Sequence, residues 1–519
     1  MMTSCLPFLD VKIMVDSCLL NGVSRLLAIK AIEISKQNVP WDEYCKIMSS
    51  FLEELRLENA PSQKPEKVTP SPIKNARMKN ISTTFHGDDF SILTCTSLGL
   101  PQCYGGFPPL FFVRGNREIV GYPTATVLNS RKPRLVDPKD EWVNGTVYLS
   151  RKFIKDKYCL VSSTGTSGYD ILSYIAWKEK CPLLIILDQP LPFWSSNSLS
   201  QEFTKKYGWL MEQENILFLS PFPSSKILPR KRRMVIRDRL VVSVARTVAI
   251  AAITDSGNMY KLASEIFEHE KVVWVFRPRS FNRLTSGNKK ILNKFQVSRP
   301  VTPEKIPPNR YSGSETDHKK YADPDRIISR FPENYLTHFT RRCPGPWPGQ
   351  SYPAYLESLT AGLPEAHHTA FETLRHILRE GTVRAGTKII RGNVPVVSLT
   401  ECTPDEIMKI TKWNRALIRW TFEPYGIAFP KDAVRQLGAR PAIYGDNLRY
   451  SKIPTKDRYL FQLDEPAKHR WKQEKEWRIR GDLRISSFET GDVLIIVKKE
   501  KEALKIINDF PYRVYIMGK

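Results

Sequence analysis

Several features that would assign the protein to a particular class are missing from this sequence. It has no uninterrupted apolar run of transmembrane length, no internal repeat, and no Cys-x-x-Cys pair among its nine cysteines. An odd number of scattered cysteines in apolar runs fits reduced thiols better than disulfides or a zinc site. Asp10, Lys12 and Asp16 interrupt the apolar N-terminal region, which is therefore a poor signal peptide. We expect a cytoplasmic protein with no membrane contact and no bound metal.

Acidic residues are too few to balance the basic ones. Lys and Arg number 79 against 54 for Asp and Glu, so the formal net charge is +25. Such a surplus favours a polyanionic partner, most often nucleic acid, which is bound through phosphate contacts and counterion release. The hydrophobic fraction of 41% and the aromatic fraction of 11% are high enough for folded domains with real cores.

Composition divides the chain into five parts. Pro-rich basic stretches separate segments whose apolar residues follow helical or strand-like patterns. The predicted parts are a helical domain at 1–58, a linker at 59–81, an α/β domain at 82–278, a basic linker at 279–332 and an α+β domain at 333–519. The pattern at 19–34 fits a helix-hairpin-helix unit or a plain helical hairpin. The fold class is therefore α/β, a Rossmann-like parallel-sheet domain between a small helical domain and an α+β domain.

Short apolar runs mark the strands of both large domains. In the central part they are separated by helix-sized segments, which predicts a parallel sheet covered on both faces. The clearest central strands are predicted at 110–113, 158–161, 183–187, 216–219, 248–253 and 272–276. In the last part, helices are predicted at 370–380 and 404–413 and strands at 394–399, 426–429, 477–480 and 493–497.

The segment CLVSSTGTSGYD at 159–170 joins an apolar strand to a glycine-containing turn and a helix. Gly165 and Gly168 allow a tight turn there, and the first N–H groups of the helix would point outward. Those donors, together with the helix dipole, attract anions such as phosphate. Turns of this kind also connect ordinary β–α units.

Several central segments occur in the order found in a known family. They are PPLFFVRGN at 108–116, VLNSR at 127–131, STGTSGYD at 163–170, ILFLSPFP at 216–223, RDRLV at 237–241, SGNM at 256–259 and VVWVFRP at 272–278. This order resembles the DNA-processing protein A (Smf) family. The resemblance implies a Rossmann-like domain that binds a nucleotide or single-stranded DNA at the carboxyl ends of its strands.

The resemblance also implies a set of pocket residues. These are Ser130, Arg131, Ser163, Gly165, Gly168, Asp170, Arg237, Arg239, Ser256 and Gly257. Asn129 and Ala252 depart from the family pattern, which usually has Gly and an acidic residue there. Asp170 and Ser256 could instead cap the helices that follow them. The basic run at 230–233 could contact phosphate or form a solvated surface.

The last part contains HFT at 338–340, VPVVSLTE at 394–401, YGIAF at 425–429 and QEKEWRIRGDL at 473–483. This pattern resembles abortive-infection protein families and, more loosely, ADP-ribosyltransferase-type folds. The resemblance implies that NAD is used, with His338 holding the nicotinamide ribose and Glu476 polarising the acceptor. Ser398 or Tyr425 would orient the ribose or stack on the nicotinamide. Glu476 could instead form an ion pair with the basic residues around it.

These observations favour a bacterial phage-defence protein. Its Rossmann-like domain would sense nucleic acid, single-stranded DNA in particular, or a nucleotide, and its C-terminal domain would act as a toxin-like ADP-ribosyltransferase. One alternative is a non-enzymatic single-stranded DNA-binding protein, and another is a nucleotide hydrolase whose chemistry lies in the Rossmann domain. Partners would be a second copy of the chain or another component of a defence system.

Overall fold

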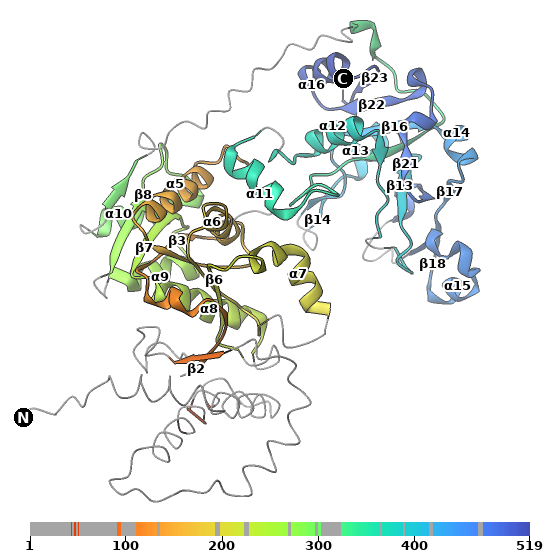
Figure 1. The fold of residues 1–519 in the computed structure, drawn as a ribbon. Helices are drawn as coiled ribbons and strands as arrows, with labels where there is room; N and C mark the ends of the chain where they lie inside the picture. Colours follow the sequence, from red (N-terminus) through yellow and green to blue (C-terminus); the bar gives the residue numbers. More distant parts are fainter. Residues whose placement is uncertain are drawn as a thin grey trace, which may run out of the picture. The chain divides into compact units, whose positions relative to one another are not determined.

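The computed structural model forms two compact units (Figure 1). It describes residues 43, 46–47, 50, 91–94, 110–131, 135–191, 198–222, 228–267, 271–295, 299–302, 323–363, 366–387, 390–414, 419–464 and 471–518. The first unit comprises Met1–Pro133, Pro138–Arg310 and Gln350–Leu363, and the second comprises Arg134–Asp137, Tyr311–Gly349 and Pro364–Lys519. The predicted N-terminal helical domain and the linker at 59–81 lie outside the described residues, apart from four positions between 43 and 50.

A nine-stranded sheet forms the centre of the first unit, in the order β1-β2-β6-β5-β4-β3-β7-β8-β9. The strands are β1 (Ser91–Thr94), β2 (Leu110–Gly115), β3 (Thr124–Asn129), β4 (Cys159–Ser163), β5 (Leu183–Ile186), β6 (Ile216–Ser220), β7 (Thr247–Ala252), β8 (Val272–Phe276) and β9 (Arg299–Val301). Strands β3 to β9 are mutually parallel. The predicted α/β class with a Rossmann-like parallel sheet is therefore confirmed.

One strand of the predicted parallel set runs the other way. Strand β2 pairs with β6 in antiparallel orientation, and β1 pairs with β2 in the same manner. An apolar run shows that a strand is buried but does not show its direction, so the sequence could not reveal this reversal.

Helices cover both faces of this sheet. On one face lie α5 (Glu141–Lys155), α6 (Ser167–Lys178) and α7 (Ser198–Met211), and on the other lie α8 (Arg230–Val244), α9 (Asn258–Phe267) and α10 (Ser286–Lys294). Each face has its own apolar core; Phe153 and Leu172 belong to one, and Leu240 and Ile266 to the other. Chain order moves outward from β3 in both directions, so the switch point of the sheet lies between β3 and β7.

A further helix joins the first unit from a distant part of the chain. Helix α11 (Tyr352–Ala361) packs against α5, α6 and α7. It begins with Ser351 as its N-cap and ends at Gly362, which adopts a left-handed conformation. Residues 350–363 thus belong to the first unit, although they follow strands of the second.

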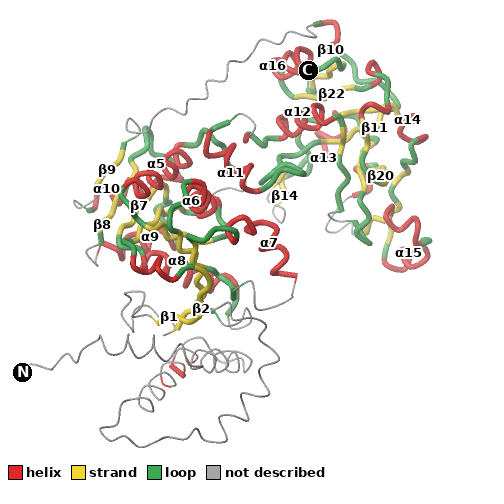
Figure 2. Tube along the Cα trace, in the orientation of Figure 1, coloured by secondary structure: helices red, strands yellow, loops and turns green. Residues whose placement is uncertain are grey.

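The second unit is built on a mostly antiparallel eight-stranded sheet, visible among the yellow strands of Figure 2. Its order is β10-β23-β22-β16-β11-β13-β20-β17. The strands are β10 (Ile327–Ile328), β11 (Tyr335–Phe339), β13 (Val396–Thr400), β16 (Gly426–Pro430), β17 (Arg440–Pro441), β20 (Glu476–Arg480), β22 (Leu494–Val497) and β23 (Arg513–Ile516).

Helices and three two-stranded sheets, β12-β21, β14-β15 and β18-β19, complete the described part of the second unit. The helices are α12 (Ala370–Glu380), α13 (Pro404–Ile410), α14 (Lys431–Gln436), α15 (Asn447–Lys452) and α16 (Glu500–Asp509). The remaining strands are β12 (Thr382–Val383), β14 (Trp413–Asn414), β15 (Arg419–Trp420), β18 (Ile443–Gly445), β19 (Phe461–Leu463) and β21 (Leu483–Arg484). The larger core contains Leu374, Val434 and Ile506 from α12, α14 and α16.

One predicted helix is too long. The segment 404–413 is helical only to Ile410, and Trp413 lies in β14. Thr411 is the C-cap residue, with extended backbone, and the chain then turns into a hairpin in which Trp413 pairs with Trp420. Cross-strand pairing of these aromatic residues replaces the last helical turn.

Candidate functional site

Loops from three neighbouring strands meet at the carboxyl edge of the first sheet. Residues 129–131 follow β3, residues 164–168 follow β4, and residues 253–257 follow β7. Because β4, β3 and β7 are adjacent and parallel, their loops share one edge at the switch point of the sheet. This edge brings together seven of the predicted pocket residues: Ser130, Arg131, Ser163, Gly165, Gly168, Ser256 and Gly257.

The turn between β4 and α6 has the geometry of an anion site. Gly165 has a φ of +88°, which is accessible at little cost only to glycine. Thr166 caps the helix by accepting a hydrogen bond from the N–H of Tyr169 (3.4 Å). Among the described residues, no group accepts a hydrogen bond from the N–H of Ser167 or Gly168. These two donors at a helix N-terminus can bind an anion.

Asn129 determines the shape of this turn. A Cβ atom at Gly168 would lie 2.8 Å from the Cβ of Asn129, so no larger residue fits at 168. The Asn129 amide donates to Thr146 Oγ1 (3.0 Å), and its carbonyl oxygen is buried without a partner among the described residues. The departure at 129 is therefore accommodated by a glycine on the neighbouring loop.

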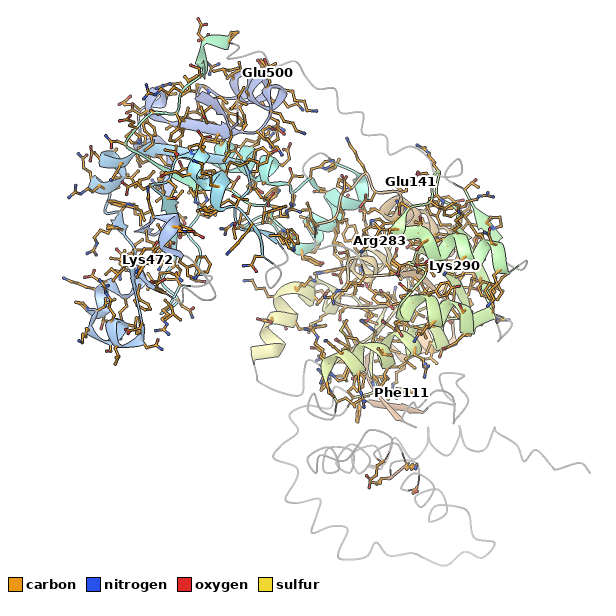
Figure 3. All side chains as sticks on the ribbon, turned by 180° about the vertical axis from the view of Figure 1, so that it is seen from behind. Phe111, Glu141, Arg283, Lys290, Lys472 and Glu500 are labelled. Atoms are coloured by element: carbon orange, nitrogen blue, oxygen red, sulfur yellow. The ribbon has the colours of Figure 1, made fainter. Side chains whose placement is uncertain are left out.

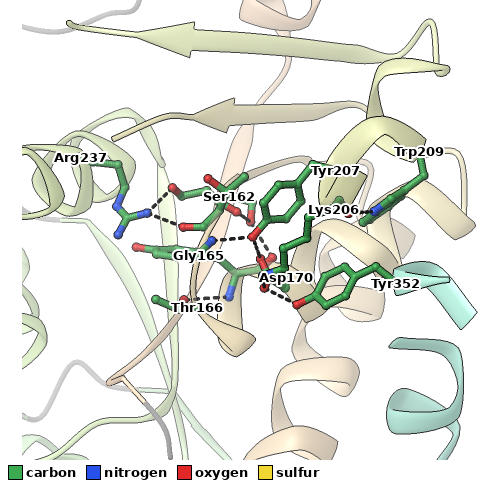
Figure 4. Close-up of polar contacts among 12 residues, drawn as sticks. Ser162, Gly165, Thr166, Asp170, Lys206, Tyr207, Trp209, Arg237 and Tyr352 are labelled. Atoms are coloured by element: carbon green, nitrogen blue, oxygen red, sulfur yellow. Dashed lines mark hydrogen bonds and ion pairs between the residues drawn. The ribbon is translucent and has the colours of Figure 1, made fainter. Parts of the chain in front are cut away.

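Asp170 lies beneath the turn and is 2% exposed (Figure 4). Its carboxylate accepts hydrogen bonds from Tyr207 Oη (2.9 Å) and Tyr352 Oη (2.6 Å), and it pairs with Lys206 Nζ (3.1 Å). Tyr207 Oη also accepts from the N–H of Gly165 (2.8 Å). Burial and the Asp170 charge raise the pKa of both tyrosines well above the usual range, so both stay protonated as donors. Asp170 therefore supports the turn from below and does not cap α6.

Arg237, from α8 on the other face of the sheet, is also buried, at 1% exposure. Its guanidinium contacts Ser163 Oγ, donates to Thr164 O (2.9 Å) and lies 2.8 Å from Asp238 Oδ1. Asp238 in turn accepts from Tyr169 Oη (3.1 Å). In this arrangement Arg237 connects α8 to the end of β4. Its predicted contact with a ligand stays a prediction.

The other predicted pocket residues lie in or near the remaining loops. Ser130 Oγ accepts from the N–H of Thr254 (3.0 Å), which ties the β3 loop to the β7 loop. Arg131 is exposed beside it. Gly257 has a φ of +92° just before α9, and Ser256 precedes it. Arg239 instead faces α9, 3.8 Å from Glu265.

Cations surround this edge. Arg230, Lys231 and Arg232 are exposed in the first turn of α8, which contains no acidic residue. Cations at a helix N-terminus oppose the helix dipole, so this arrangement favours a bound anion. Arg230 lies 3.4 Å from Asp188, which follows β5. Lys290, labelled in Figure 3, lies 3.5 Å from Asp255 in the β7 loop.

The four residues predicted as catalytic in the second unit do not form one cluster. Thr337 pairs with Thr400, and Thr400 pairs with Glu476, so these three side chains leave one face of the sheet. His338 is one position out of step with Thr337 and therefore points to the other face. Its Nδ1 lies 2.9 Å from Ser398 O, and burial lowers its pKa.

Ser398 and Tyr425 are separated in the same way. Ser398 pairs with Arg478 on the face that carries Glu476. Tyr425 precedes β16 and donates through its hydroxyl to Glu502 Oε1 (3.1 Å) of α16. Burial raises the pKa of Tyr425, which remains a hydrogen-bond donor. Ser398 and Tyr425 thus have different neighbours in the structure, although the prediction placed both of them in one NAD site.

Glu476 forms the ion pair that the sequence left open as an alternative. Its two carboxylate oxygens accept from Arg478 Nε (3.0 Å) and Nη2 (2.8 Å). Arg478 is 1% exposed and also donates to Tyr459 O (2.8 Å) and Phe461 O (2.9 Å). This bidentate pair fixes the Glu476 carboxylate in one orientation.

Glu474 is a titratable residue that the sequence reading missed. It ends the short 3-10 helix Trp471–Glu474, two positions before Glu476. Burial and the Glu476 carboxylate raise the pKa of Glu474 to about 7, although Arg341 and Lys412 oppose the shift. Its carboxylate has no hydrogen-bond or ion-pair partner within the described chain. The Glu-x-Glu spacing was the available signal, since a second carboxylate close by raises the pKa of the first through charge repulsion.

The hydroxyl of Thr337 lies on the same face as Glu476. Thr337 is 1% exposed, and its Oγ1 is buried without a hydrogen-bond partner among the described residues. Tyr444 Oη accepts from the N–H of Glu476 (3.1 Å). The second unit thus combines a fixed carboxylate, a protonatable one and an unsatisfied hydroxyl at one end of β13 and β20. A carboxyl group with a raised pKa beside a second carboxylate and polar neighbours is typical of acid–base sites.

Three further histidines lie in the second unit. His376 stacks on Trp347 (centroids 4.4 Å apart), and His368 contacts the same ring system (3.8 Å). His367 lies 3.6 Å from Asp137. The parts of the chain that the structure describes contain no group of three His, Cys, Asp or Glu residues able to hold a metal ion. No helix in those parts is long and apolar enough to span a membrane.

Comparisons with known proteins find no matching family model and no matching curated protein. The chain is similar to solved structures at low identity. DNA processing protein A from Streptococcus pneumoniae is 14% identical over 54% of this chain and 89% of that one, with a TM-score of 0.34. The protein of the same name from Helicobacter pylori, described with a single-stranded DNA binding mode, is 17% identical over 41% and 90%, with a TM-score of 0.33.

A third solved structure is a molybdenum cofactor binding protein from Rippkaea orientalis. It is 11% identical over 35% of this chain and 91% of that one, with a TM-score of 0.23.

Proposed function

We propose that the first unit binds single-stranded DNA, or a nucleotide, through phosphate groups at the carboxyl edge of its sheet. The observation that carries the proposal is the pair of N–H groups at Ser167 and Gly168, which donate to nothing among the described residues. They lie at the carboxyl edge of a doubly wound sheet, one strand from its switch point, and such folds bind ligands at this edge. Arg131 supplies an exposed cation on the adjacent loop.

The exposed cations at the start of α8 favour a strand over a single nucleotide. Arg230, Lys231 and Arg232 extend the basic surface beyond the β4–α6 turn, so one phosphate cannot reach all of these groups. A net charge of +25 supports the same choice, because phosphate contacts release counterions. Asp170 and Arg237 have a structural role in this proposal, because their contacts hold the turn in shape. The alternative of a nucleotide hydrolase is less well supported, because Asp170 is buried and already accepts three contacts.

Binding of labelled oligothymidylate across a range of salt concentrations tests the proposal. Replacing Arg230, Lys231 and Arg232 together by Ala should weaken binding and reduce the slope of log affinity against log salt by about 2. Arg131→Ala should reduce it by about 1. Arg151→Ala on α5, exposed and paired with Glu179, is the matched control. If the slope of log affinity against log salt is unchanged in both test variants, the proposal is wrong.

For the second unit we propose acid–base catalysis at Glu474, with NAD as substrate. With a pKa of about 7, Glu474 is partly ionised near neutral pH, and its carboxylate would take the proton of an acceptor nucleophile, while the paired Glu476 carboxylate stabilises positive charge on the ribose. The bond from ribose to nicotinamide would break, nicotinamide would leave as a neutral molecule, and the acceptor would form the new bond to the ribose carbon.

Consumption of NAD by the full chain tests this second proposal. Glu474→Gln should abolish turnover, and the wild-type rate should titrate with an apparent pKa near 7. Glu489→Gln, an exposed glutamate of the same unit, should leave the rate unchanged. If NAD is never consumed, with or without single-stranded DNA, the transferase proposal fails and the DNA-binding proposal stands.

Together the two proposals describe a defence protein in which DNA recognition controls a toxin-like effector. Protection of bacterial cells against phage should then depend on Glu474 and on the cations of α8. Equal plating of phage on cells that carry the wild-type protein and on cells that lack it would contradict this role.

A further inference from the structure

A hairpin in the second unit exposes two tryptophan side chains side by side. Trp413 in β14 pairs directly with Trp420 in β15, so both rings leave the same face. Their centroids are 5.7 Å apart in an edge-to-face arrangement, and the residues are 45% and 44% exposed. Tryptophan at this exposure is uncommon outside binding surfaces, because each ring could bury a large apolar area.

The base of the hairpin is fixed, although its rings are exposed. The N–H of Lys412 donates to Thr421 Oγ1 (3.0 Å), and the N–H of Thr421 donates to Lys412 O (2.9 Å). Arg341 donates to Thr421 O (3.0 Å) from the neighbouring β11 segment. The two rings are therefore held in place before any partner binds, which lowers the entropic cost of binding.

The charge of the residues around the hairpin indicates which kind of partner the two tryptophans would bind. The described part of this segment contains Lys409 and Lys412, and the sequence from 409 to 420 has no acidic residue. Lys409 and Lys412 are exposed in this segment. Aromatic rings interleaved with cations are the combination that binds single-stranded nucleic acid, because unpaired bases stack on the rings while cations contact the phosphates. In a duplex the base faces are already stacked and cannot use such a surface.

We propose that Trp413 and Trp420 form a stacking platform for the bases of a single-stranded nucleic acid, with Lys409 and Lys412 at its phosphates. The platform is separate from the phosphate site of the first unit and needs neither that site nor the transferase chemistry. Lys412 and Arg341 also act on the charge of Glu474, so the hairpin lies beside that carboxyl group. A strand on the platform would present its bases or sugars near Glu474. Only this placement of the strand near Glu474 rests on the proposed transferase function, in which the nucleic acid would then be the acceptor.

Photo-cross-linking of the full chain to an iodouracil-substituted single strand tests the platform. Mass spectrometry should place cross-links at Trp413 or Trp420, in protein with the intact first-unit site and in protein that carries the triple α8 substitution. The double variant Trp413→Ala with Trp420→Ala should lose these cross-links and weaken binding in the α8-substituted protein by at least about tenfold. Both tryptophans replaced by Phe should retain most of the binding.

Three controls make the outcome decisive. Tyr122→Ala removes an aromatic residue of similar exposure, 48%, in the first unit and should change nothing. Circular dichroism of the Phe and Ala variants reports whether the hairpin substitutions unfold the unit. Cross-links confined to the first unit, or equal losses for single-stranded and double-stranded DNA, would overturn the proposal. The transferase step fails separately if the platform binds but no modified nucleic acid forms with NAD.

Discussion

The hydroxyl of Tyr352 donates a 2.6 Å hydrogen bond to Oδ2 of Asp170, a residue 182 positions earlier in the chain. Tyr352 opens α11, and Asp170 lies in the first turn of α6 beneath the glycine turn. Lys206 Nζ lies between the two elements, 4.5 Å from the centre of the Tyr352 ring. Residues from three helices therefore fix the shape of one loop.

Removing the Tyr352 hydroxyl should destabilise the first unit. Tyr352→Phe keeps the ring but deprives a buried carboxylate of one donor, and hydrogen bonds to charged groups contribute about 1.5–3 kcal/mol. Urea unfolding followed by a probe in the first unit would measure the loss. Tyr122→Phe, an exposed tyrosine, is the matched control. Equal stability of the two variants would show that Asp170 does not need this donor.

Arg237 and Arg131 should respond in opposite ways to substitution. Arg237→Met leaves Asp238 buried without its cation, so the free energy of unfolding should fall by about 3–5 kcal/mol. Arg131→Ala removes an exposed cation and should weaken DNA binding at unchanged stability. Melting curves and oligothymidylate binding, measured on both variants, separate the roles. A fully stable Arg237→Met variant would contradict the structural role of Arg237.

Gly168 and Asn129 should be coupled. Gly168→Ala places a Cβ atom against Asn129, and overpacking of this kind costs about 1–3 kcal/mol. Asn129→Gly removes the obstacle, so the double variant should recover most of that stability. A double-mutant cycle by thermal unfolding gives the coupling energy. Strictly additive effects would mean that the loops adjust independently.

Glu474 should make stability depend on pH in a defined direction. Its pKa of about 7 in the folded protein lies above the pKa of a glutamate in an unfolded chain. At a pH between these two values, the folded state therefore binds more protons than the unfolded state. Stability should therefore fall as the pH rises from about 4.5 to about 7. Glu474→Gln removes this titration and should gain up to about 3 kcal/mol relative to wild type over that range.

Unfolding at both ends of this pH range, with Glu489→Gln as control, measures the effect. The same pH dependence in Glu474→Gln as in the wild type would assign the titration to another group.

The strands of the first unit were predictable because they are buried on both faces. The runs at 216–219 and 272–276 coincide closely with β6 and β8. Strand direction was not predictable, as β2 shows. The same apolar run is compatible with either orientation, and only its pairing with β6 decides it.

Local sequence patterns could not predict the contacts that support the candidate site. Asp170 could be identified from its place after the turn, but Tyr207 and Tyr352 come from α7 and α11, and nothing in their own neighbourhoods indicates this contact. For Glu476 the sequence left catalysis and ion pairing open, and the pairing with Arg478 depends on rotamers that no motif specifies. Strand register explains why His338 and Glu476 point apart: a single step along β11 reverses the face.

The path of the chain between the two units limits how they can be exchanged during evolution. The segment Gln350–Leu363 returns to the first unit after strands of the second have been built. A gene fragment that stops at residue 310 would encode the whole sheet of the first unit but not the tyrosine that binds Asp170. Recombination that transfers the complete first unit to another protein must therefore carry α11 with it. The first unit is discontinuous in sequence, so a single cut between the two units cannot leave it whole.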